Sequence, residues 1–167
     1  ARPAPVPGSR ARPILPHYSP GGQPAEMAEL GAALLVETLP AYLRGDIQPQ
    51  PQDDSMATYA PMLTKADGHL NFSLPADYLA RQVRAMQPWP GAVALLNGQP
   101  LKVLVARVIP GHAAPGQVLQ VGKQVAVGTG TDLLALDQIQ PPGKKPMPAM
   151  AYANGNPQFL TSILEQP

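Results

Sequence analysis

The sequence predicts a mainly β fold: a small antiparallel barrel with one helix, preceded by an isolated helix and a linker. Three observations lead to this prediction. After residue 55, short apolar runs alternate with tight-turn signals such as Asn97-Gly98 and Gly122-Lys123. No strand–helix–strand rhythm separates these runs, so a parallel sheet is not expected. One amphipathic helical segment precedes them, and closely spaced short strands with a single helix are typical of a small barrel.

The first third of the chain is expected to stay outside this barrel. Residues 1–25 carry seven prolines and the pair Gly21-Gly22, which predicts an extended or disordered lead-in. Residues 26–45 place Leu30, Leu34 and Leu39 near helical spacing. Pro40 lies inside this pattern and is expected to kink or end the helix. Residues 46–55 are polar and interrupted by prolines, which indicates a linker.

Residues 56–167 are predicted to form the barrel domain, and its helix comes first. Asp67-Gly68 is expected to be a turn, because glycine adopts positive φ easily. The helix is predicted to begin at Ser73 or Leu74, with Pro75 in its first turn. Pro88 is expected to stop it. Its buried stripe is predicted to be Leu79, Val83 and Met86.

The strands follow the helix. Residues 141–167 are expected to be proline-rich turns with a loop at Asn154-Gly155-Asn156. The predicted strands are Ala92–Leu96, Leu101–Ile109, Gln117–Val121, Gln124–Gly128 and Asp132–Gln140.

Composition limits the function classes. The 167 residues have a net charge of +1. Residues 1–54 hold four Lys/Arg against six Asp/Glu, and the remainder holds eight against five. A modestly basic second part suits either a polyanion partner or an ordinary solvated surface, and both readings are open. The absence of cysteine excludes disulfides and thiolate metal sites.

No metal or membrane association is expected. The three histidines are far apart in sequence, without the spacing of metal ligands. No apolar run approaches the ~20 residues that span a bilayer.

No catalytic residues are predicted. The chain has no Gly-x-Ser-x-Gly, no P-loop and no Gly-x-Gly-x-x-Gly that opens a helix. Gly128-Thr129-Gly130 precedes a strand, so it lacks the helix N-terminus that makes such a loop bind phosphate.

The segment Pro88-Trp89-Pro90-Gly91 is interpreted as a rigid structural corner. We expect Trp89, the sole tryptophan, to be packed in the core at one end of the barrel, because flanking prolines suit a fixed packed corner. The alternative is an exposed platform on which a nucleobase stacks, worth ~1–3 kcal/mol per base.

Lys144 and Lys145 are the leading candidates for binding a polyanion. They follow Pro141-Pro142-Gly143, and prolines reduce the entropy that is lost when a loop is held in place. Contact with phosphate and a solvated loop tip are both open readings. Further basic candidates for the same surface are Arg81, Arg84, Lys102, Arg107 and Lys123. Lys65 is a candidate as well.

Several segments resemble, in one order, the methionyl-tRNA formyltransferase family. They begin with the helical run from Leu30 to Leu39 and continue with Pro51-Gln52-Asp53-Asp54. The later segments are Lys65-Ala66-Asp67-Gly68-His69-Leu70, Pro88-Trp89-Pro90-Gly91-Ala92 and Ile139-Gln140-Pro141-Pro142-Gly143-Lys144-Lys145-Pro146-Met147.

The resemblance implies a C-terminal barrel of the OB type that holds initiator methionyl-tRNA by its backbone. It also implies 10-formyltetrahydrofolate as the co-substrate of the family, with no cofactor bound by this chain, and a location in the cytoplasm or an organellar matrix. The helix over residues 26–45 resembles the end of the family's catalytic domain. Because that domain's Asn, His and Asp are not found here, we expect the chain to be inactive alone.

Three alternatives remain open at this point. The chain could work beside a separate catalytic polypeptide that docks on the apolar face of the first helix. It could be the scaffold domain of a related formyltransferase that acts on a nucleotide sugar or folate. It could also be a truncated product without function.

Overall fold

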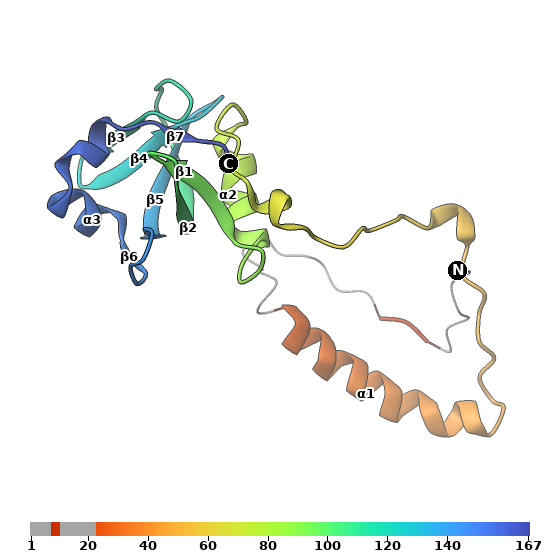
Figure 1. The fold of residues 1–167 in the computed structure, drawn as a ribbon. Helices are drawn as coiled ribbons and strands as arrows, with labels where there is room; N and C mark the ends of the chain where they lie inside the picture. The colour runs from red at the N-terminus through yellow and green to blue at the C-terminus, as the bar shows by residue number, and fades with distance from the viewer. Residues whose placement is uncertain (1–7, 11–22) are drawn as a thin grey trace. The chain divides into compact units, whose positions relative to one another are not determined.

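The computed structural model describes residues 8–10 and 23–167 (Figure 1). The chain divides into two compact units, residues 1–62 and 63–167. Most of the lead-in expected over residues 1–25 lies outside the described residues.

The first unit contains the helix α1, Gln23–Leu43. Pro40 lies inside α1 and the helix continues to Leu43, so, of the kink or end expected at Pro40, the end is not observed. The missing N–H of Pro40 costs one hydrogen bond in the last turn, while Arg44 N still donates to Pro40 O at 3.2 Å. A short 3-10 turn, η1, Asp54–Met56, overlaps the end of the predicted linker over residues 46–55.

The second unit is a mainly β domain, as predicted. Its strands form one antiparallel sheet in the order β3-β4-β5-β2-β1-β7, with β6 paired to β5. The strands are β1 Ala92–Leu96, β2 Gln99–Ile109, β3 Val118–Val121, β4 Gln124–Gly128, β5 Leu133–Gln140, β6 Met147–Pro148 and β7 Leu164–Glu165.

Tight turns set the register of the hairpins. Asn97 and Gly98 both have positive φ, 52° and 72°, which is the conformation that a two-residue hairpin turn requires. This turn pairs Leu96 with Gln99 and places Val93 opposite Lys102. The prediction of a hairpin at Asn97-Gly98 is confirmed.

The two ends of the sheet path meet. An isolated antiparallel bridge joins Gln117, just before β3, to Ile163, just before β7. Val118 N donates to Ser162 O at 2.9 Å, and Leu164 N donates to Gly116 O at 2.8 Å. These bonds close the curled sheet into a small barrel.

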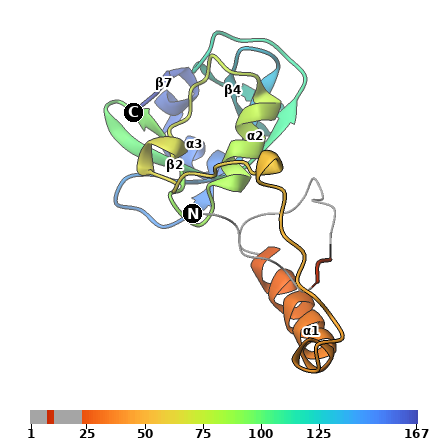
Figure 2. The same ribbon diagram turned by 90° about the vertical axis from the view of Figure 1, so that its right-hand side faces the viewer.

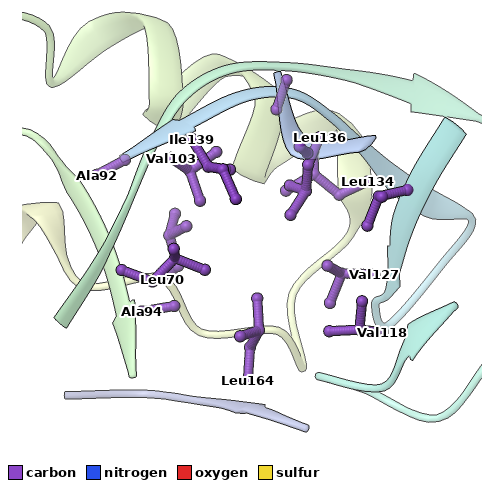
Figure 3. Packing of buried hydrophobic residues seen from close by; sticks show 14 of the residues in the cluster. Leu70, Ala92, Ala94, Val103, Val118, Val127, Leu134, Leu136, Ile139 and Leu164 are labelled. Carbon is purple, nitrogen blue, oxygen red and sulfur yellow. The ribbon is translucent and has the colours of Figure 1, made fainter. Parts of the chain in front are cut away.

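The helix α2, Ala76–Ala85, packs on β2 and β5 (Figure 2). Pro75 is its N-cap and not a residue of its first turn. The predicted stripe holds in part, because Leu79 and Val83 are buried whereas Met86 is only half-buried. The barrel interior is filled by aliphatic side chains from the helix, from most strands and from the segment before α2 (Figure 3). Leu70, Val103, Leu134, Ile139 and Leu164 are among them.

The expectation that Trp89 packs in the core is wrong. Trp89 is 56% exposed. The corner between α2 and β1 is held by its backbone and by Gln87 instead: Gly91 N donates to Met86 O at 2.8 Å, and Gln87 Nε2 donates to Val103 O at 3.2 Å. Because Leu70, Leu79 and Val83 already fill the barrel interior, the indole is not needed there.

Gly68 serves a different purpose from the one predicted. It lies in the 3-10 turn η2, Lys65–Gly68, and its φ is not positive. A Cβ at this position would lie 2.0 Å from Gly91 O, so glycine is required by the close approach of the two backbones.

The tail holds more structure than expected. The helix α3, Ala149–Gly155, occupies the predicted loop at residues 154–156 in part, and the 3-10 turn η3, Pro157–Thr161, follows it. β6 and β7 also come from this region. Ala149, Ala153 and Phe159 are buried in the core, so tertiary packing stabilises elements too short to show periodicity.

Candidate nucleic-acid interface

The loop between β5 and β6 presents Lys144 and Lys145. Lys144 N donates to Pro141 O at 3.1 Å, and Gly143 has a φ of +67°. Proline at the second position and a left-handed glycine at the third are typical of a type II turn. The side chain of Gln140 then donates to Lys144 O at 3.0 Å. The sequence Pro141-Pro142-Gly143 therefore builds a defined turn that ends on the lysine pair.

Lys144 is also held through its side chain. Its Nζ lies 5.3 Å from the centroid of the Tyr152 ring, within the range of a cation–π interaction. Tyr152 belongs to α3 and meets Phe159 edge to face, with centroids 5.1 Å apart and planes at 75°. Phe159 is buried. A chain of aromatic contacts thus connects the lysine to the core.

Lys102 lies at the same end of the sheet as this turn. It is exposed on β2 and stands opposite Gln140 of β5, the residue whose side chain binds Lys144 O. Directly opposed residues of an antiparallel pair point to the same face. The structure therefore brings three predicted candidates, Lys102, Lys144 and Lys145, to one region, which we call the lysine cluster.

Two other candidates are already paired with carboxylates. Arg81 binds Asp77 at 2.7 Å, one helical turn away, and this hydrogen bond holds the pKa of Asp77 below its ordinary value. Arg107 Nε lies 3.2 Å from Asp137 Oδ2. Arg107 is also five residues along β2 from Lys102, which is roughly 17 Å of strand. The positive charge of Arg81 and Arg107 is partly balanced by a neighbouring carboxylate, which weakens its attraction for a phosphate.

The last two candidates lie on separate elements. Arg84, half-buried on α2, donates to Ala80 O at 3.2 Å. Lys123 lies at the tip of the hairpin between β3 and β4. Among residues 8–10 and 23–167, no carboxylate pairs with Arg84, Lys102, Lys123, Lys144 or Lys145 in a salt bridge.

The sequence of the barrel domain contains a long stretch without acidic residues. No Asp or Glu occurs between Asp77 and Asp132, a stretch that holds Arg81, Arg84, Lys102, Arg107 and Lys123. The resulting local excess of positive charge favours the approach of a polyanion. Sequence reasoning missed Gln140 and Tyr152 as supports of the lysine pair, because the contacts join separate elements and leave no local pattern.

Other kinds of site find no support in the described part of the chain. No group of three or more His, Cys, Asp and Glu side chains that could hold a metal ion occurs there. None of the helices in residues 8–10 and 23–167 is long and apolar enough to cross a membrane.

Comparisons with known proteins agree with this fold. Residues 62–157 match the family described as formyl transferase, C-terminal domain. The chain is 43% identical over 154 residues to a methionyl-tRNA formyltransferase of Roseiflexus sp. (strain RS-1), covering 90% of this chain and 47% of that protein. It is 49% identical over 140 residues to one of Heliobacterium modesticaldum, covering 77% of this chain and 44% of that protein. The chain thus spans about half the length of the curated relatives it matches.

A solved structure shares the fold. It is described as HypX from Aquifex aeolicus in complex with tetrahydrofolic acid, and it superposes with a TM-score of 0.55 at 21% identity. The match covers 75% of this chain and 22% of that one. At this identity the likeness concerns the fold alone.

Proposed function

Because the chain belongs to the formyl transferase C-terminal domain family and is similar to methionyl-tRNA formyltransferases, we propose that it is the tRNA-binding part of such an enzyme. In this role it holds the sugar–phosphate backbone of initiator methionyl-tRNA. The formyl donor of the whole enzyme would be 10-formyltetrahydrofolate, bound outside this barrel, and no chemical step is assigned to residues of this chain.

The lysine cluster is the observation that carries the proposal. Its three ammonium groups come from β2 and from the turn after β5, and none forms a salt bridge with a carboxylate within residues 8–10 and 23–167. Each lysine that meets a phosphate releases condensed counterions, which gives affinity that falls with salt. Lysine acts as a point charge, so it grips the backbone and does not read bases.

Binding of the tRNA backbone by lysines affects the KM of the reaction and not its kcat. Contacts far from the reacting amine stabilise the bound substrate and the transition state equally, so they lower KM without raising kcat. The choice of initiator tRNA over other tRNAs then comes from elsewhere in the enzyme, because phosphate contacts carry no sequence information.

The test is binding of labelled initiator tRNA to the purified chain over a salt series. Three phosphate contacts predict a slope of log K against log salt of about −2.7 if each behaves as on a duplex, or about 40-fold weaker binding between ~50 and ~200 mM salt. Lys144→Ala/Lys145→Ala should leave one contact, a slope of about −0.9 and a loss of about 3.5-fold over the same range.

Arg81→Ala/Arg107→Ala is the matched control, since it removes the same charge from residues that are already paired. We expect it to change the slope less than the lysine double variant does. Equal changes would mean that net charge, and not the lysine cluster, governs binding. No binding at low salt would refute the proposal and favour a scaffold domain of a related formyltransferase.

A further inference from the structure

We propose that Trp89 is a stacking platform for an unpaired nucleobase of the RNA that the lysine cluster holds. The inference rests on the proposed function and deepens it, because it adds a base contact to a surface otherwise suited only to phosphate. Its starting point is the 56% exposure of the sole tryptophan.

The corner that carries the indole is fixed. Gly91 N donates to Met86 O, and Gln87 Nε2 donates to Val103 O. On the other side, Gly68 fits against Gly91 O with no room for a Cβ. A large aromatic ring on a fixed corner loses little conformational entropy when a ligand stacks on it.

Pro88 and Pro90 have no backbone N–H, so the residues on either side of Trp89 bring no main-chain donor to a base edge. Stacking on an aromatic face tolerates any base, since every base has a π-face. The platform would therefore select unpaired bases over paired ones and would not select sequence.

The platform lies beside the basic surface. Gln87 binds the carbonyl of Val103, the residue that follows Lys102 on β2. Ala92, three residues after Trp89, pairs with Val103, and Val93 pairs with Lys102. Arg84 precedes the corner at the end of α2. Basic residues beside an exposed aromatic ring are the combination by which proteins bind single-stranded nucleic acid.

The sole tryptophan makes the test direct, because the intrinsic fluorescence of the chain reports on Trp89. We would titrate the chain with three probes: initiator tRNA, an unstructured RNA strand and a blunt RNA duplex. Stacking predicts quenching by the first two probes and little change with the duplex. Equal quenching by the duplex, or none by any RNA that binds, would overturn the inference.

Trp89→Leu should weaken binding of the RNA strand and the tRNA by about 5- to 150-fold, the range of one stacked base. It should leave duplex binding and the salt slope unchanged, since no charge is removed. Tyr59→Leu removes another exposed ring and should have no effect. Trp89→Phe, which keeps an aromatic face, should recover part of the affinity and guards against a folding defect in the leucine variant.

The outcomes separate this inference from the proposed function. Salt-dependent binding that needs Lys144 and Lys145 but leaves the fluorescence of Trp89 unchanged would refute the stacking platform alone. Absence of any RNA binding would refute both. A shift in emission that depends on protein concentration without RNA would show that a second copy of the chain covers Trp89, and would also overturn the inference.

Discussion

The contact between Lys144 and Tyr152 can be tested by a double-mutant cycle. The ammonium lies 5.3 Å from the ring centroid on a half-exposed surface, so its attraction should be worth about 0.5–1 kcal/mol. The edge-to-face pair of Tyr152 with Phe159 should add about 0.5–1.5 kcal/mol. Tyr152→Leu therefore lowers the free energy of unfolding by about 1–2.5 kcal/mol, and Lys144→Ala by about 0.5–1 kcal/mol.

The double variant should be no less stable than Tyr152→Leu alone, because the lysine has lost its partner already. This gives a coupling energy of about 0.5–1 kcal/mol in urea unfolding followed by circular dichroism. Tyr152→Phe is the control, since it keeps both ring interactions, and should stay close to the unmodified chain. Additive losses, with a coupling below about 0.3 kcal/mol, would show that the ring does not hold the ammonium in solution.

The remaining predictions concern the stability of the barrel. Gly128→Ala should lower the free energy of unfolding by about 1–3 kcal/mol or more, because the new Cβ would lie 2.1 Å from Ala114 O. Gly155→Ala is the control, since the space around Gly155 is open, and it should show no comparable loss in thermal melts. Leu134→Ala, fully buried on β5, should lower the free energy of unfolding by about 2–5 kcal/mol in urea. Asp67→Asn should lower Tm at neutral pH but not in strong acid. Hydrogen bonds from Thr64 hold the pKa of Asp67 below its ordinary value of 3.8. The stability that the ionised carboxylate contributes is therefore present above pH 3.8 and is lost as the pH falls through the lower pKa of the folded state. Equal effects of this change at both pH values would contradict the reasoning.

Much of the barrel was predictable because two or three neighbouring residues specify each of its tight turns. Asn97-Gly98 and Gly122-Lys123 fixed two hairpins, and the boundaries of β1 and β4 match the predicted ones. The sequence also placed the lysine pair in a loop after Pro141-Pro142-Gly143, and the structure shows that this loop is a defined turn. These signals are short-range, so the sequence carries them without knowledge of the fold.

The rest depends on distant partners. Nothing near Trp89 shows that the barrel interior is already filled by residues such as Leu70 and Val83, so its exposure could not be inferred. The role of Gly68 is set by Gly91, 23 positions away. α3 has only seven residues, too few for a helical period to be recognised.

The closure of the barrel by β7 has a consequence for synthesis in the cell. Leu96 and Leu164 pair across 68 positions of the chain. At a translation rate of about 5–20 residues per second, the outer edge of β1 waits about 3–14 seconds for its partner strand. An unpaired strand edge is a template for association with other chains. The nascent domain therefore passes through a period of vulnerability that ends only when its closing strand leaves the ribosome.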